Sequence, residues 1–164
     1  MEDHFSELIV PKKPNPLNML LKILLIFATV VAAFLGIFAS PIFMIVLIGV
    51  IIADYFLFPR FNVEYEYTYV NGEIDIAAIY SKSSRKNLAQ IDLENVECVA
   101  PYGSHHLDSY GITFKEVDYS SGYPEQKPYV IIKGGTNNQK ILLHLDETML
   151  EDLKWRLPGK VFRD

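Results

Sequence analysis

The chain has 164 residues, half of them hydrophobic, and a formal net charge of −5 at pH 7. This acidity argues against nucleic acid as a partner, because affinity for nucleic acid comes largely from cations that neutralise phosphates. The single cysteine, Cys98, excludes an internal disulfide.

The N-terminal segment, residues 1–15, combines a short apolar patch, LIV, with a basic stretch that is interrupted by prolines. Prolines at this spacing exclude a long helix. We therefore expect either a tether or a strand that needs a partner, and place the segment in the cytoplasm.

Two membrane spans are predicted between residues 16 and 58, where Lys22 and Asp54 are the only charges. One straight helix over this stretch would measure about 63 Å, roughly twice the hydrocarbon thickness of a bilayer. Ser40-Pro41 divides the stretch, because a serine hydroxyl can cap a helix start and proline suits the first helical position. Asn15-Pro16 is a second pair of a polar capping residue and a proline, at the start of the first helix. The prediction is a transmembrane hairpin with helices at about 16–38 and 41–58.

The distribution of lysine and arginine predicts the orientation of this hairpin. Lys12, Lys13 and Lys22 lie near one end, Arg60 follows the other, and the connecting turn has no charge. By the positive-inside rule both termini face the cytoplasm, which predicts a two-span protein of the cell membrane. A secretory signal peptide is the competing interpretation, but the apolar stretch starts late, is too long and follows an acidic start.

Lys22 and Asp54 are candidate intramembrane site residues. Folding the hairpin about its turn leaves them offset by about 4.5 Å along the axis, so they could form a structural charge pair. Each could instead extend to the membrane surface independently. An ion or proton pathway is the third possibility, since ionisable residues in spans are often functional.

The chain from residue 61 to 164 predicts a cytoplasmic domain. Apolar and aromatic residues alternate with polar ones from Phe61 to Tyr69, as in a half-buried strand. Asn71-Gly72 then favours a type I′ hairpin turn, in which both central residues have positive φ. Pairing Val70 with Glu73 places Tyr69 opposite Ile74 and keeps apolar residues on one face.

Further strands and one helix are predicted after this hairpin. The strand-like segments are 88–93, 96–100, 112–117, 129–133 and 140–145. Asp146 can cap a helix that keeps Met149, Leu150, Leu153 and Leu157 on one side, and Pro158-Gly159 ends it. The predicted fold is an α+β membrane protein: the helical hairpin, then an antiparallel barrel or bent sheet of about seven strands with a C-terminal capping helix.

Few residues are candidates for binding, and no set suggests a reaction. Lys82, Arg85 and Lys86 form the densest basic patch, which could bind lipid phosphate or an acidic partner peptide, although a solvated hairpin loop is the favoured interpretation. His105, His106, Asp108 and His144 lack the paired spacing of zinc ligands. Cys98 is expected to be a buried small apolar residue. We predict no catalytic residue, metal or cofactor.

Two stretches carry a resemblance to a known family: the hairpin EYTYVNGEIDI and SRKNLAQIDLENVECV at 84–99. With the terminal helix they resemble bacterial pleckstrin-homology-like domains that follow membrane spans directly. The whole chain, with VPKKP before the hairpin and LPGKVF near the end, is similar to a family of small uncharacterised membrane proteins of Gram-positive bacteria. The resemblance implies a fold and a membrane anchor, and no activity.

Relatives that bind phosphoinositide lipids usually do so with basic residues in the first loop between strands. Here that loop is Val70-Asn-Gly-Glu73, without a cation. We therefore expect no phosphoinositide binding by that route.

The expected function is a non-enzymatic interaction or scaffold module at the cytoplasmic membrane face. Its partner would be another protein or a second copy, bound at exposed strand edges or a groove between strands and helix. The alternative is an accessory subunit of a membrane transporter or envelope-assembly complex, in which Lys22 and Asp54 face a partner's helices.

Overall fold

A computed structural model describes residues 5–111 and 113–163, which form an α+β fold. The elements in chain order are β1 (Phe5–Pro11), α1 (Pro16–Phe38), α2 (Ile42–Leu57), the 3₁₀ helix η1 (Phe58–Phe61), β2 (Val63–Val70), β3 (Glu73–Tyr80), β4 (Ser84–Ile91), β5 (Val96–Pro101), the 3₁₀ helix η2 (His105–Leu107), β6 (Lys115–Asp118), β7 (Tyr129–Lys133), β8 (Gln139–Leu143) and α3 (Glu147–Arg156). Contacts divide the chain into two compact units. One unit consists of Pro14–Val63 and Ile79–Arg85; the other holds the remaining described residues.

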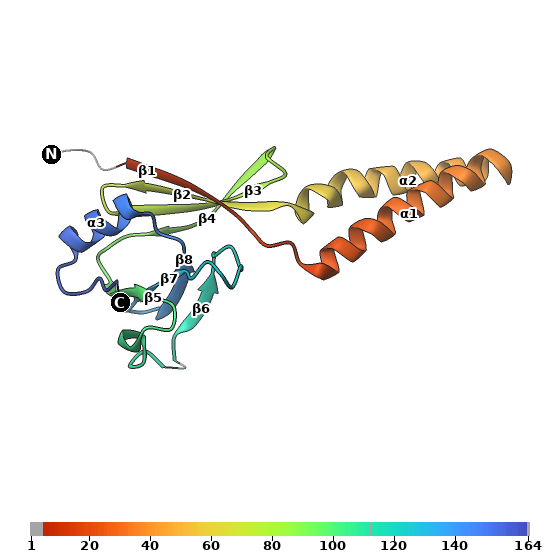
Figure 1. Ribbon diagram of the computed structural model, residues 1–164. Coiled ribbons are helices and arrows are strands. Elements are labelled where there is room, and N and C mark those ends of the chain that lie inside the picture. Colours follow the sequence, from red (N-terminus) through yellow and green to blue (C-terminus); the bar gives the residue numbers. More distant parts are fainter. Residues whose placement is uncertain (1–4, 112, 164) are drawn as a thin grey trace. The chain divides into compact units, whose positions relative to one another are not determined.

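The helices α1 and α2 form a hairpin, and they lie side by side in Figure 1. Both are long and apolar enough to cross a membrane, over Pro16–Phe38 and Ile42–Phe61. The predicted helix bounds agree with the structure to within a residue at each end. The expected cap is present at Asn15, whose side-chain oxygen accepts a hydrogen bond from the Leu17 N–H at 3.0 Å.

The start of α2 differs from the expected serine cap. Pro41 occupies the cap position, and no side chain caps the helix. The carbonyls of Ser40 and Pro41 instead accept hydrogen bonds from the Phe43 and Met44 N–H groups, both at 3.0 Å. A tight backbone turn therefore satisfies the first free donors of α2, and the serine hydroxyl is not needed for this.

Small residues on α1 allow α2 to approach closely. A Cβ atom on Gly36 would lie 2.8 Å from the Met44 sulfur, a separation too short for two nonbonded atoms. Ala32, one turn earlier, is only 6% exposed. Close packing of this kind is what holds helices together in lipid, where burying apolar surface brings no advantage over contact with acyl chains.

The first sheet, sheet A, has the strand order β1-β2-β3-β4. β1 runs antiparallel to β2, with Phe5 opposite Val70 and Pro11 opposite Glu64. The N-terminal segment is thus a strand, and its partner lies on the other side of the helical hairpin in sequence.

The turn from β2 to β3 has the expected backbone. Asn71 and Gly72 have φ values of 50° and 99°, as a type I′ turn requires. The tyrosines at 65, 67 and 69 are buried, with Ile74 and Ile76 of β3. The adjacency of β2 and β3 is confirmed, while the residue-by-residue register between them stays a prediction.

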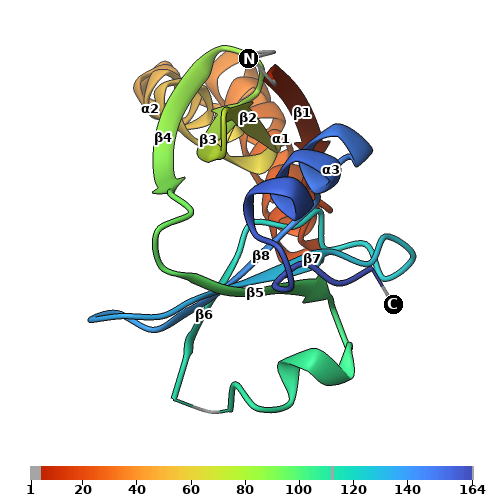
Figure 2. The same ribbon diagram turned by 90° about the vertical axis from the view of Figure 1, so that its left-hand side faces the viewer.

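The second sheet, sheet B, has the order β5-β7-β8-β6 and is open (Figure 2). β7 is antiparallel to both β5 and β8, but β6 runs parallel to β8, with Val117 opposite Ile141. The expectation of antiparallel pairing is wrong for this pair, because the long segment after β5 brings the chain back in the direction of β8. The strand expected from Ile112 begins, in the described residues, at Lys115; Ile112 itself lies outside them.

Both faces of sheet B are buried around β5, β7 and β8, whereas the outer strand β6 is mostly exposed. One face carries Val99, Ile131 and Ile141, which lie opposite one another across β5, β7 and β8. The other face is a cluster covered by side chains of the segment after β5 and of the C-terminus. The cluster consists of Cys98, Ala100, Val130, Ile132 and Leu142, and its cover of Leu107, Tyr110, Phe114 and Phe162.

The C-terminal helix α3 begins and packs as predicted. The Asp146 carboxylate accepts a hydrogen bond from the Met149 N–H at 2.7 Å, and Met149, Leu150 and Leu153 are buried. Asp146 also accepts a hydrogen bond from the Ser6 hydroxyl on β1. After α3, Val161 bridges to Val99 of β5, so the C-terminal part of the chain contacts both sheets.

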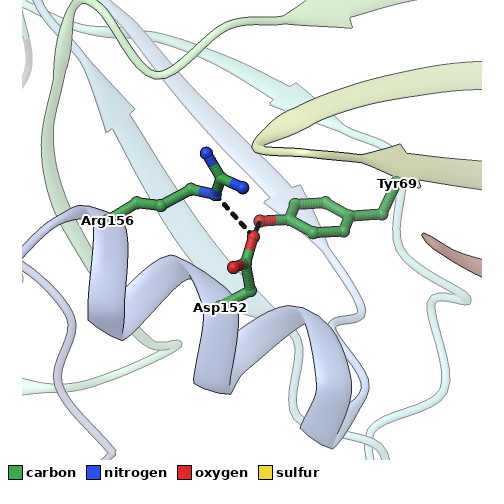
Figure 3. A network of polar contacts seen from close by, with 3 residues as sticks. All are labelled: Tyr69, Asp152 and Arg156. Carbon is green, nitrogen blue, oxygen red and sulfur yellow. Dashed lines mark hydrogen bonds and ion pairs between the residues drawn. The ribbon is translucent and has the colours of Figure 1, made fainter. Parts of the chain in front are cut away.

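A buried polar network fixes α3 to sheet A (Figure 3). One oxygen of the Asp152 carboxylate accepts hydrogen bonds from the Tyr69 hydroxyl and from Arg156 Nε, the latter at 2.7 Å. Asp152 is only 4% exposed. Burial raises the pKa of Tyr69 well above its ordinary value, and the neighbouring carboxylate raises it further, so the hydroxyl keeps its proton and remains a donor.

We predict that Tyr69→Phe lowers the free energy of unfolding by about 1–3 kcal/mol, because it removes a hydrogen bond to a buried charged group. The measurement is denaturant unfolding of the full chain in detergent. Tyr102→Phe is the matched control, since Tyr102 is 55% exposed; it should change stability by less than about 0.5 kcal/mol. Equal effects of the two substitutions would contradict a stabilising role for the network.

Candidate functional site

The predicted basic patch lies in and after the turn that joins β3 to β4. Lys82, Arg85 and Lys86 are all exposed. Ser81 and Lys82 have positive φ values of 48° and 58°, which non-glycine residues seldom adopt. The turn thus presents its side chains from a tightly bent backbone.

Hydrogen bonds join this turn to the chain just after α2. The Ser81 N–H donates to the Asn62 carbonyl at 2.9 Å, and the Ser81 hydroxyl donates to the Pro59 carbonyl at 3.3 Å. Pro59 belongs to η1, which continues directly from α2. The structure therefore places the basic turn beside the end of the second apolar helix, a proximity that charge spacing alone did not reveal.

The structure gives Asp54 a contact other than the predicted one. Its Oδ2 accepts a hydrogen bond from the Thr29 hydroxyl of α1 at 2.6 Å, while its Oδ1 is buried without a hydrogen bond among the described residues. Lys22 lies seven residues before Thr29, about 10 Å along the helix axis. The structure thus brings Asp54 to Thr29, and a pairing of Asp54 with Lys22 stays a prediction.

A second polar cluster, which the sequence analysis did not identify, surrounds His144 at the end of β8. His144 Nε2 accepts a hydrogen bond from the Ser121 N–H at 3.1 Å and lies 3.1 Å from the Ser121 hydroxyl. Burial lowers the pKa of His144, and the nearby Asp118 carboxylate partly opposes this effect. Asp118 accepts hydrogen bonds from the Ser120 N–H at 2.8 Å and hydroxyl at 2.6 Å.

This Ser-His pair does not have the features of a nucleophile. Ser121 is only 1% exposed, so a substrate could not reach its hydroxyl. The Ser121 hydroxyl oxygen also accepts a hydrogen bond from the Tyr123 N–H at 3.3 Å, and the Ser121 carbonyl accepts one from the Lys13 N–H at 2.7 Å. The pair fixes the loop before β7 against β8 and the chain after β1.

The other predicted candidates are dispersed. The rings of His105 and His106 lie 4.0 Å apart, and His106 stacks on Phe162 at 3.6 Å. Asp108 lines an open hollow of about 450 Å³ together with Lys140. In the described part of the chain, no group of three or more His, Cys, Asp or Glu side chains could hold a metal. Cys98 is buried in the cluster on sheet B, as predicted.

One cation near the β2–β3 turn was missed by sequence reasoning. A Cβ atom on Gly72 would lie 3.1 Å from Cδ of Arg156. Arg156 comes from α3, more than 80 residues later, so no local pattern could indicate this approach. Its guanidinium is bound to Asp152, a contact that raises the pKa of Arg156.

We predict that Thr29→Val destabilises the helical hairpin by about 1 kcal/mol, the typical cost of losing a side-chain hydrogen bond between helices in a membrane. Thermal unfolding in detergent measures the effect, and Thr29→Ser, which keeps the hydroxyl, is the matched control. Lys22→Met distinguishes the two candidate partners of Asp54. A loss with Lys22→Met and none with Thr29→Val would mean that Asp54 pairs with Lys22 instead.

We predict a pH effect from His144. Its pKa is lowered in the folded chain, so between that value and about pH 6.5 the unfolded chain binds more protons. The resulting stability is present above about pH 6.5 and is lost as the pH falls through the folded pKa. The wild type should therefore lose more stability than His144→Gln between about pH 7.5 and about pH 5.5 in denaturant titrations. Parallel losses in both proteins would exclude this role.

Comparison with known proteins assigns the chain to a family. Residues 2–163 match the family described as "Bacterial PH-like domain (DUF6106)". No curated protein and no solved structure matches the chain. Because the match covers nearly the whole length, including both apolar helices, the chain belongs to the family of bacterial pleckstrin-homology-like domains.

Proposed function

We propose that this protein is a membrane-anchored, non-enzymatic interaction module. Two transmembrane helices hold its pleckstrin-homology-like domain at the cytoplasmic face of the cell membrane. The observation that supports this most strongly is the pairing of β1 with β2, on either side of the helical hairpin in sequence.

Strand pairing restricts the number of times the chain crosses the membrane. Pro11 of β1 lies opposite Glu64 of β2, and the intervening residues include both apolar helices. Two strands can pair only on the same side of a bilayer. A single crossing would separate them, whereas two crossings return the chain to its partner strand. The pairing thus favours insertion of α1 and α2 as a hairpin.

The charges around the hairpin favour the cytoplasmic side for the domain. Lys12 and Lys13 precede α1, and Arg60 follows α2. The basic turn at Lys82 is hydrogen-bonded through Ser81 to the chain after α2 and adds cations at the same end. The turn between the helices has none, so the distribution agrees with cytoplasmic termini.

The described side chains support a binding role rather than catalysis. Acid–base catalysis needs a titratable group that a substrate can reach, beside a second group that transfers or stabilises charge. Two polar networks that contain residues with shifted pKa values centre on Asp152 and on Ser121, which are 4% and 1% exposed. Both connect elements of the fold, as structural networks do.

Strand edges are the surfaces that we propose for partner binding. β4 is an outer strand of sheet A, and its residues from Ser84 to Asn87 are exposed. An extended segment of another protein, or of a second copy, could add to such an edge through backbone hydrogen bonds. The outer edge of β5 is less available, because Val161 already bridges to it.

One observation favours the alternative role, an accessory subunit of a membrane transporter or envelope-assembly complex. α2 has no buried residue along its length, and a Cβ on Gly49 would meet no atom within 4 Å. This surface is open to lipid or to the helices of a membrane partner.

Photo-crosslinking in cells separates the two roles. A crosslinking residue replaces Asn87 on β4 in one variant and Gly49 on α2 in another. We expect discrete adducts from position 87, because the domain carries the interaction. Adducts from position 49 alone would favour the accessory subunit, and their absence from both positions, in cells that express the protein at its natural level, would refute an interaction module.

The same cells provide a test of topology. Asn137 is exposed in the turn between β7 and β8, and Asn137→Cys in a Cys98→Ala background gives one accessible thiol. An impermeant thiol reagent should label it only after the cells are permeabilised. Labelling in intact cells would place the domain outside and overturn the proposed orientation.

A further inference from the structure

We infer that the β3–β4 turn binds anionic lipid headgroups of the leaflet from which α2 emerges, with Lys82 and Arg60 as the main contacts. This inference rests on the proposed membrane insertion of α1 and α2. It assigns a ligand class, the anionic phospholipid headgroup, to a surface within one compact unit of the chain.

The first argument is the position of the turn along the chain's path out of the membrane. The candidate span of the second helix reaches Phe61. Ser81, directly before Lys82, is hydrogen-bonded to Pro59 and Asn62, which lie on either side of that end. A lysine side chain can extend several ångströms from its backbone while its ammonium stays in a polar layer. Lys82 therefore lies within reach of the headgroups beside the emerging helix.

The aromatic residues around the end of α2 also place this part of the chain at the level of the lipid headgroups. Tyr55 and Phe56 are 76% and 66% exposed, and the rings of Phe58 and Phe61 lie 6.2 Å apart in the next turn of the chain. Tyrosine is enriched where hydrocarbon meets water, with its hydroxyl at the level of the headgroups. The hydrogen-bonded turn is thus attached to the part of the span that has the composition of a membrane interface.

The second argument is charge. The stretch from Ile79 to Asn87 contains Lys82, Arg85 and Lys86 and no acidic residue, although the chain as a whole carries −5. Arg60 is exposed beside Pro59. The nearest acidic residues in sequence to Arg60 are Asp54, hydrogen-bonded to Thr29, and Glu64. A local group of cations beside the end of a span is suited to an anionic leaflet.

The shape of the turn favours a lipid surface over an acidic peptide. Residues 81–83 are all exposed at the tip of the β3–β4 hairpin, before β4 begins, and Ser81 and Lys82 adopt the left-handed conformation of a tight turn. A peptide is usually held in a groove or along a strand edge. An exposed hairpin tip can contact a planar array of phosphates without a complementary concave surface.

The test measures which lipid gathers around the turn. Exposed Ser84 is replaced by cysteine in a Cys98→Ala background and labelled with a fluorophore. The full chain is reconstituted in phosphatidylcholine vesicles that contain a small fraction of nitroxide-labelled phosphatidylglycerol or, in parallel, nitroxide-labelled phosphatidylcholine. Quenching of the fluorophore gives the relative association of the two lipids with the turn.

We expect the anionic lipid to associate more than about tenfold better than phosphatidylcholine at low salt, and this preference to fall roughly fivefold for each of Arg60→Ser and Lys82→Ser. High salt should also reduce the preference for the anionic lipid, because salt screens exposed charges. Lys127→Ser is the matched control: it removes an exposed lysine from the other unit and should leave the preference unchanged.

Three results would overturn the inference: equal quenching by the two lipids, a preference that survives Arg60→Ser with Lys82→Ser, or an equal loss with Lys127→Ser. Displacement of the lipid by a poly-glutamate peptide at low concentration would show that the turn binds acidic peptide instead. An alkaline carbonate wash of the same vesicles distinguishes a failure of lipid binding by the turn from a failure of the proposed membrane insertion. Protein that stays in the washed vesicles has inserted its hairpin, whatever the quenching shows.

Discussion

The pairing of β1 with β2 is the constraint on which the arrangement of this protein depends. It closes a loop of about fifty residues that contains both apolar helices. Closing such a loop costs conformational entropy, although the cost grows only slowly with length. The register from Phe5–Val70 to Pro11–Glu64 offsets it, with further support from the hydrogen bond between Ser6 and Asp146 at the start of α3. The helical hairpin is therefore an insertion between two neighbouring strands of a sheet and is not an appendage on a single linker.

The two sheets differ in how many of their faces are covered by other parts of the chain. In sheet A, alternation leaves one face of β2 and β3 in the core and the other more exposed. Sheet B is covered twice, and its second face depends on the segment after β5, which contributes Leu107, Tyr110 and Phe114. That segment has little regular structure and a polar composition. Its structural role is nevertheless clear, because without it the cluster around Cys98 and Ile132 would face water.

Periodic features of the chain were predictable, and contacts between distant residues were not. Apolar length fixed the two helices to within a residue, Asn71-Gly72 fixed the turn through the φ values that it permits, and Asp146 fixed the start of α3. These depend on neighbours in sequence. The parallel pairing of β6 with β8, the Thr29–Asp54 hydrogen bond and the network of Tyr69 with Asp152 depend on partners 24 to 83 positions away, so no periodic pattern in the sequence indicates them. The same limit applies to the basic turn: its cations were visible in the sequence, but their closeness to the end of α2 was not.

The order of the strands has a consequence for biosynthesis. β1 is the first described element to leave the ribosome, and its neighbour β2 is translated only after both apolar helices. In the proposed topology, β1 stays on the cytosolic side during that interval, unpaired and with Phe5 and Ile9 exposed, while the hairpin inserts into the membrane. Completion of the sheet would then be coupled to insertion: a nascent chain whose hairpin has failed to fold back leaves β1 without its neighbour, in a form that chaperones and proteases can recognise.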